Sequence, residues 1–66
     1  MSSFNEQHAK YNQLAAEAAA TLDDQLARIR RDQDEGTITI REGADERVQV
    51  LQEHLDRLRL LREEFL

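Results

Sequence analysis

Two histidines, His8 and His54, are the side chains best suited to acid–base catalysis or metal binding, and they lie far apart in the chain. Helical proteins often build metal sites from Glu-x-x-His pairs on facing helices. No such pair occurs here, and Glu53 and His54, being adjacent on a helix, point in different directions. We therefore expect solvated or boundary histidines, no metal site and no cofactor.

Nucleophilic catalysis finds equally little support. The chain has no cysteine, and its only serines are Ser2 and Ser3. Ser3 and Glu6 have the spacing of a capping box, so a role at a helix start explains Ser3. Carboxylates are plentiful, but the sequence places none of them in an apolar pocket that would tune its pKa. We expect no catalytic residue and interpret the protein as a non-enzyme.

Arginines form two clusters that could contact phosphate, at 28–31 and at 57–62. Both clusters are interleaved with or flanked by acids, which repel phosphate, and neither contains an aromatic residue on which a base could stack. Fourteen acids against nine bases give a net charge of −5, which argues against general binding to nucleic acid or to an anionic membrane. We interpret both clusters as solvated helix faces, which makes nucleic acid an unlikely partner.

The stretch DEGTITIRE at 34–42 organises the rest of the chain, because it combines a helix stop with a helix start. Gly36 can adopt the left-handed conformation that ends a helix. Thr39 and Glu42 have the spacing of a second capping box. With no proline and only two glycines, the chain favours helix almost everywhere else. We predict a single all-α domain: a helix over about 4–35, a turn at 36–39 and a helix over about 40–65.

The first predicted helix has one apolar face with steps of three and four residues. Its alanine-rich part, 14–20, fits either helix-favouring filler or a face for close packing. Acids and arginines four residues apart within 24–35 predict a salt-bridged surface. The expected apolar positions are Phe4, His8, Tyr11, Ala15, Ala18, Leu22, Leu26 and Ile29.

The second predicted helix has a more strongly apolar stripe, widened by Val50 to one side, and a stripe this wide needs two neighbours. Gly43 costs about 1 kcal/mol relative to alanine, which indicates either a close backbone approach or a helix start nearer Ala44. We favour the start at the capping box. The stripe comprises Ala44, Val48, Leu51, Leu55, Leu58, Leu61 and Phe65.

A short turn makes the two helices antiparallel, and pairing outward from it sets the alanine-rich run against Leu55, Leu58 and Leu61. His54 then lies opposite Ala20 and Thr21, far from His8. One hairpin of 66 residues has little to bury, so we predict a homodimeric four-helix bundle. The predicted oligomer interface is Leu22, Leu26, Ile29, Val48, Leu51, Leu55, Leu58, Leu61 and Phe65, and the candidate surface for another protein is Leu60, Leu66, Arg57 and Arg59.

Part of the chain resembles a known family. Leu26, Ile29, Gly36, Ile38, Thr39, Glu42 and Leu51 are similar to the pattern of the short helical hairpins called SHOCT domains, although Gly43 stands where that family usually has an aromatic residue. The resemblance covers 26–51 and implies a small oligomerisation or interaction module.

Three functions remain open on the sequence. The first is a regulatory or scaffolding module for protein–protein interaction. The second is a Rop-like nucleic-acid-binding regulator, because a dimeric hairpin can bind structured RNA through one face of its bundle. The third is an acidic inhibitor or mimic of phage type, suggested by size and charge. The N-terminus has neither the basic start nor the apolar core of a signal peptide, and no run is long enough to span a membrane, so we expect a cytoplasmic protein.

Overall fold

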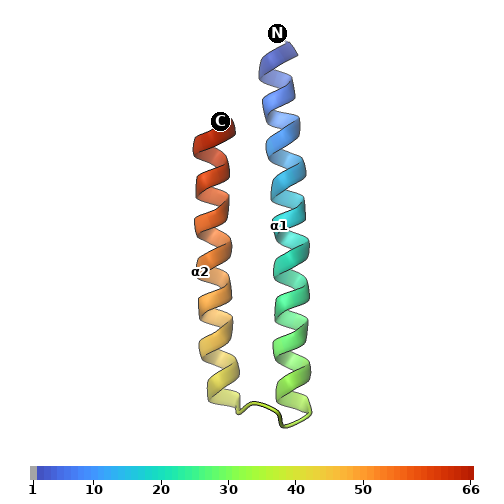
Figure 1. Cartoon of the computed structure of the whole chain (residues 1–66), viewed down its shortest axis with the longest axis vertical. Helices are drawn as coiled ribbons and strands as arrows, with labels where there is room; N and C mark the ends of the chain where they lie inside the picture. Colours follow the sequence, from blue (N-terminus) through green and yellow to red (C-terminus); the bar gives the residue numbers. More distant parts are fainter. Residues whose placement is uncertain (1) are drawn as a thin grey trace.

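The computed structural model describes the backbone of residues 2–66 and the side chains of residues 5–66. Helix α1 spans Ser2–Asp34 and helix α2 spans Ile40–Phe65. The two helices lie antiparallel and side by side, and no strand occurs in this described part (Figure 1). The predicted all-α hairpin is confirmed. Helix α1 begins slightly earlier than expected, with Ser3 inside it, and the side chain of Ser3 lies outside the described residues.

The end of α1 is closed by backbone hydrogen bonds around Gly36, whose φ is +79°. Gly36 N–H donates to the Gln33 carbonyl at 3.1 Å, and Thr37 N–H donates to the Asp32 carbonyl at 2.8 Å. A residue with a Cβ is strained at this φ, so glycine permits the chain to reverse here. The left-handed stop predicted at Gly36 is confirmed.

The start of α2 is fixed by the predicted capping box. Glu42 N–H donates to Thr39 Oγ1 at 3.0 Å, and Thr39 N–H donates to Glu42 Oε1 at 2.8 Å. Two amide groups that have no partner within the helix are thereby satisfied. Helix α2 begins at Ile40, so Gly43 lies in its first turn and the alternative start nearer Ala44 is wrong.

Removing the Thr39 hydroxyl should weaken the whole hairpin, because α2 loses one of the hydrogen bonds at its start. We expect Thr39→Ala to lower the free energy of unfolding by about 1 kcal/mol. Urea denaturation followed by circular dichroism measures this loss. Thr39→Ser keeps the acceptor oxygen and serves as the matched control, so equal losses in both variants would contradict the capping role.

The capping box should also make stability depend on pH. Hydrogen bonds from the Thr39 backbone and side chain lower the pKa of Glu42 below its ordinary value, with a smaller opposing effect of desolvation. The unfolded chain then binds the proton more readily, so the stabilisation is present at neutral pH and is lost as pH falls through the lowered pKa. We expect the melting midpoint to fall between about pH 6 and about pH 3, and to fall less in Glu42→Gln. Parallel curves for the two proteins would contradict this role.

The seam between the helices matches the prediction for α1 from Tyr11 onward, whereas the predicted His8 is exposed and the side chain of Phe4 lies outside the described residues. On α2 the prediction is confirmed for Leu58, Leu61 and Phe65 only. On α1, Ala18 and Ile29 are buried, at 4% and 3% exposure, and Tyr11, Ala15, Leu22 and Leu26 are half-buried. On α2, the buried and half-buried positions are Gly43, Arg47, Val50, His54, Leu58, Leu61 and Phe65. The predicted packing of Leu55 against the alanine-rich run is wrong, because Leu55 is 63% exposed. Val50, expected at one side of the stripe, lies in the seam instead.

The hairpin is long and thin. Its Cα atoms extend over 53 × 16 × 8 Å, and their radius of gyration is 15.5 Å. A compact domain of this length has a radius of gyration of about 11 Å. The N-terminal turns of α1 project beyond the end of α2 (Figure 1). The molecule is therefore a single layer of two helices.

Candidate interaction surface

A row of apolar side chains on α2 faces solvent beside the seam. We call Ile40, Ala44, Val48, Leu51 and Leu55 the α2 stripe; their steps of four, four, three and four residues place them on one side of the helix. Ile40 is 78% exposed, Val48 58%, Leu51 42% and Leu55 63%. A contiguous exposed apolar surface of this kind is typical of an interaction site.

Leu26 of α1 lies on the same broad side of the hairpin as the α2 stripe. Viewed along a helix from its N-terminus to its C-terminus, each residue advances about 100° around the axis. In this view Leu26 is displaced from the seam residue Ile29 in the same direction of rotation as the α2 stripe is displaced from the seam residue Gly43. In antiparallel helices that sense corresponds to the same side of the pair. We call Leu26 and the α2 stripe together the apolar face.

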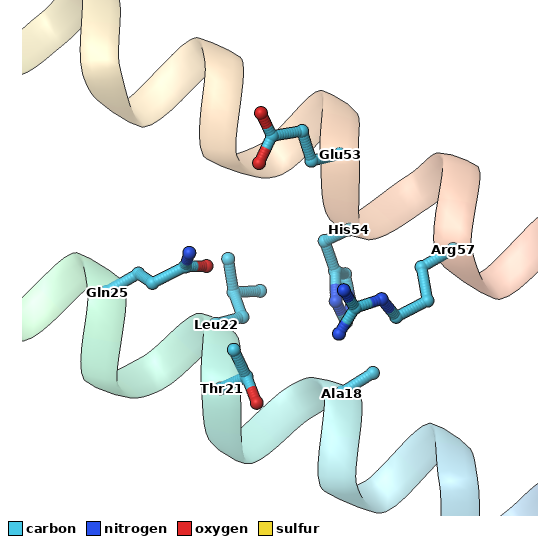
Figure 2. Close-up of a pocket in the computed structure, with 7 residues that line it drawn as sticks. All are labelled: Ala18, Thr21, Leu22, Gln25, Glu53, His54 and Arg57. Atoms are coloured by element: carbon cyan, nitrogen blue, oxygen red, sulfur yellow. The ribbon is translucent and has the colours of Figure 1, made fainter.

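The opposite side of the seam is polar. A small cavity there is lined on α1 by Ala18, Thr21, Leu22 and Gln25, and on α2 by Glu53, His54 and Arg57. In the view of Figure 2 the Arg57 side chain and the His54 ring overlap, both toward α1, while the Glu53 carboxylate extends in another direction. The cavity volume of about 40 Å³ holds a few water molecules and no larger ligand. The side of the α2 stripe also carries charge, because Leu26 shares a hollow there with Arg30, Gln33, Asp34 and Arg47.

The histidines are placed differently by the fold. His54 is half-buried at the seam and lines the small cavity together with Thr21, one of its two predicted neighbours. His8 is exposed and lies near the N-terminus of α1. Within residues 5–66, no group of three or more His, Asp or Glu side chains is arranged to hold a metal ion. The structure therefore does not bring the two histidines together.

Charged side chains cover the outer surfaces. Arg59 pairs with Asp56, one helical turn before it, at 3.8 Å, and both side chains are more than half exposed. Exposed pairs of this kind contribute little to stability. Among the described side chains, none of the acid–arginine pairs predicted within 24–35 comes within ion-pair distance. The prediction of salt bridges within 24–35 is therefore wrong.

One polar contact between the helices was not predicted from the sequence. The half-buried Arg47 donates from Nη1 to Gln33 Oε1, across the seam near the turn. The Gln33 side chain lies directly over Gly43, where a Cβ would be 2.8 Å from Gln33 Cγ. The close approach expected at Gly43 is thus made by a side chain, not by backbone. In the sequence, a glycine within a helix indicated a close approach at Gly43, but it did not identify Gln33 as the residue that makes it.

Replacing Gly43 should reveal this contact. Gly43→Ala gains about 1 kcal/mol of helix propensity but pushes Gln33 away from Arg47. In a Gln33→Ala background only the gain remains, so we expect the same substitution to be more stabilising there. A double-mutant cycle of urea midpoints measures the difference. Equal effects of Gly43→Ala in both backgrounds would contradict the contact.

The predicted interface residues fall into two groups. Ile29 is buried, and Leu22, Leu26, Leu58, Leu61 and Phe65 are half-buried within the hairpin. Val48, Leu51 and Leu55 are exposed. The candidate partner surface is also exposed and comprises Leu60, Leu66, Arg57 and Arg59.

No protein-family model, curated protein or solved structure matches this chain. Neither helix, over its described residues, is long and apolar enough to cross a membrane.

Proposed function

We propose that the chain is a non-enzymatic protein–protein interaction module that acts as a homodimeric helical hairpin. The observation that supports this function is the α2 stripe, whose four large side chains are between 42% and 78% exposed. Exposing apolar surface to water costs about 25 cal/mol per Å². Packing a second apolar surface onto the stripe is therefore favourable. A four-helix bundle of two hairpins would provide that surface.

The total surface area points the same way. The hairpin exposes 5281 Å² for a mass of 7.7 kDa. A compact monomer of this mass exposes about 4,300 Å². The excess, roughly 1,000 Å², is comparable to the roughly 800 Å² that each partner buries in a stable protein complex.

The layer structure supports the same proposal. Ala18 and Ile29 are the buried apolar residues of the described part, and no large side chain there is fully enclosed. Domains generally enclose a core between two packed layers, and this hairpin supplies one. A second hairpin would supply the other layer and convert the apolar face into a core.

The regulatory part of the function would use the surface outside the apolar face. Leu60, at 60% exposure, points away from the stripe, whereas Leu66, at 57%, follows Leu55 by eleven residues and lies nearer the stripe's side of α2. Exposed Arg57 and Arg59 are on the same helix. A bundle formed through the apolar face would leave Leu60 free to contact another protein.

Self-association can be tested by the concentration dependence of thermal unfolding. A protein stabilised by dimer formation melts at a higher temperature when more concentrated. We expect the midpoint measured by circular dichroism to rise between micromolar and hundredfold higher concentration. A midpoint that stays constant over this range would refute the homodimer.

Binding of a further protein is tested by affinity capture with the tagged chain from its native host, using Leu60→Glu as the matched variant. The proposal predicts a defined partner that the wild-type chain recovers and the variant does not. Recovery of the same proteins by both chains would exclude Leu60 from the partner surface. Recovery of no protein by the wild-type chain would count against a regulatory role.

A further inference from the structure

A charged hollow lies on the apolar face near the turn. Leu26, Arg30, Gln33 and Asp34 line it from α1, and Arg47 lines it from α2. Its volume is about 410 Å³. Two guanidinium groups and one carboxylate give the hollow a net charge of +1. A second hairpin that covered the apolar face would also cover this hollow.

The two arginines of the hollow are not neutralised within the hairpin. Among the described side chains, Asp34 lies beyond ion-pair distance of both Arg30 and Arg47. The half-buried Arg47 donates to the amide oxygen of Gln33, which carries no charge. Enclosing an unpaired charge between protein surfaces is strongly unfavourable. A surface that covers the hollow is therefore favoured when it brings a negative group.

The apolar face carries one carboxylate outside the hollow, that of Asp23. Steps of three and four residues join Asp23, Leu26 and Arg30, so their side chains lie on one side of α1. Asp23 is exposed. Counted at about 100° per residue, the other acids of the two helices, apart from Asp34, are turned away from this face. A two-fold dimer uses the same surface of both chains, so the carboxylate available to the hollow is Asp23 of the second copy.

The level of Asp23 along α1 suits one arrangement of two hairpins. Asp23 precedes Arg30 by seven residues and lies ~10.5 Å further from the turn, at ~1.5 Å per residue. If the two turns are at opposite ends of the bundle and the two-fold axis passes beside Leu26, each Asp23 lies over the hollow of the other chain. If the turns are at the same end, the two hollows face each other and four guanidinium groups meet, which is unfavourable.

We infer that Asp23 of a second copy of this chain enters the hollow beside Arg30 and Arg47, and that Asp23 of the first copy enters the hollow of the second. This inference rests on the proposed homodimer and names an ionic contact within it. Each occupied hollow contains two guanidinium groups and two carboxylates and is neutral. The contact therefore favours a second copy over apolar helices that bring no carboxylate to this level.

Charge reversal tests this contact. Asp23→Arg adds a third guanidinium to each hollow in the dimer, which raises its net charge to +2. Arg30→Asp leaves each hollow with one guanidinium and two carboxylates, to which Asp23 of the other chain adds a third carboxylate. We expect each variant alone to dimerise at least about tenfold more weakly than the wild type, because like charges then meet in the interface. Sedimentation equilibrium over a series of concentrations measures this change.

An equal mixture of the two variants tests whether these side chains meet each other. In a mixed pair, the Asp23→Arg chain keeps its native hollow and receives the native Asp23 of the other chain. The hollow of the Arg30→Asp chain receives the introduced guanidinium. Both hollows are then neutral, so we expect the mixture to recover most of the tenfold loss. Circular dichroism checks that both variants keep the helix content of the wild type.

Asp24 and Arg31 provide a matched control. They have the same charges and the same spacing of seven residues, but they lie one residue later in α1 and line a separate hollow away from the apolar face. The changes in net charge are therefore identical. We expect Asp24→Arg and Arg31→Asp each to dimerise as the wild type does, and their mixture to do the same.

The outcomes separate this inference from the proposed function. If Asp23→Arg weakened the dimer no more than Asp24→Arg, the inference would be overturned and the proposed homodimer would stand. The same conclusion would follow if the Asp23→Arg and Arg30→Asp chains were both weakened but did not recover on mixing. A wild-type protein that sediments as one chain would refute both the inference and the homodimer.

Discussion

Leu55→Glu is expected to reduce the sedimenting mass to that of one chain, 7.7 kDa. Leu55 is 63% exposed in the hairpin and belongs to the α2 stripe, so the hairpin itself tolerates a carboxylate there. In the proposed dimer two carboxylates would be buried without partners, and each buried unpaired charge costs several kcal/mol. Since about 1.4 kcal/mol corresponds to a tenfold change, we expect dimerisation to weaken more than about 100-fold.

Leu60→Glu provides the matched control for this substitution. Leu60 is 60% exposed, on the same helix but outside the stripe. The change in side chain and charge is the same, so net charge alone cannot explain a difference between the variants. We expect Leu60→Glu to sediment as the wild type does. Equal weakening in both variants would show that the apolar face is not the interface.

Ile29→Ala should cause the largest loss of stability among single truncations. Ile29 is 3% exposed and lies at the seam, where its removal leaves a cavity. Truncating a buried isoleucine to alanine typically costs 2–5 kcal/mol, and we expect about 3 kcal/mol here. Small domains have a total stability near the lower end of roughly 5–15 kcal/mol, so this loss would leave little folded protein at moderate temperature.

Urea denaturation of Ile29→Ala, wild type and Leu60→Ala at one protein concentration tests this expectation. Leu60→Ala removes a leucine that is 60% exposed and should change stability by less than about 0.5 kcal/mol. Similar midpoints for the two variants would mean that the seam around Ile29 is not the core of the hairpin.

Local features of the fold were predictable because few residues determine them. Gly36 ends α1 in the left-handed conformation, and Thr39 with Glu42 closes the capping box, as their spacing indicates. Helix periodicity identified the side of α1 that packs at the seam, including Ala18 and Ile29. These predictions depend on backbone geometry within one or two turns, which sequence encodes directly.

The orientation of α2 was not predictable in the same way. Its most apolar side, which includes Leu51 and Leu55, faces solvent in the hairpin, while Gly43, Arg47 and His54 lie along the seam. Periodicity finds an apolar side but does not say which of two neighbouring helices covers it. The seam includes a close approach over Gly43 and the hydrogen bond of Arg47, and neither contributes to apolar periodicity.

The candidate surface was therefore only partly predictable. Val48, Leu51 and Leu55 were expected at an interface because the predicted stripe was too wide for one neighbour. Which of these side chains remain exposed beside α1 depends on how α2 is rotated about its axis, and therefore on contacts with α1 such as that of Gln33 over Gly43. Residues distant in sequence decide this rotation, so the spacing of apolar residues within α2 alone could not predict it.

Sedimentation equilibrium of the wild-type chain at micromolar concentration tests the central claim most directly. We expect the mass of two chains, shifting toward the 7.7 kDa of one chain only on strong dilution. A single species with the mass of one chain throughout that range, and with the helix content of a folded hairpin, would contradict it.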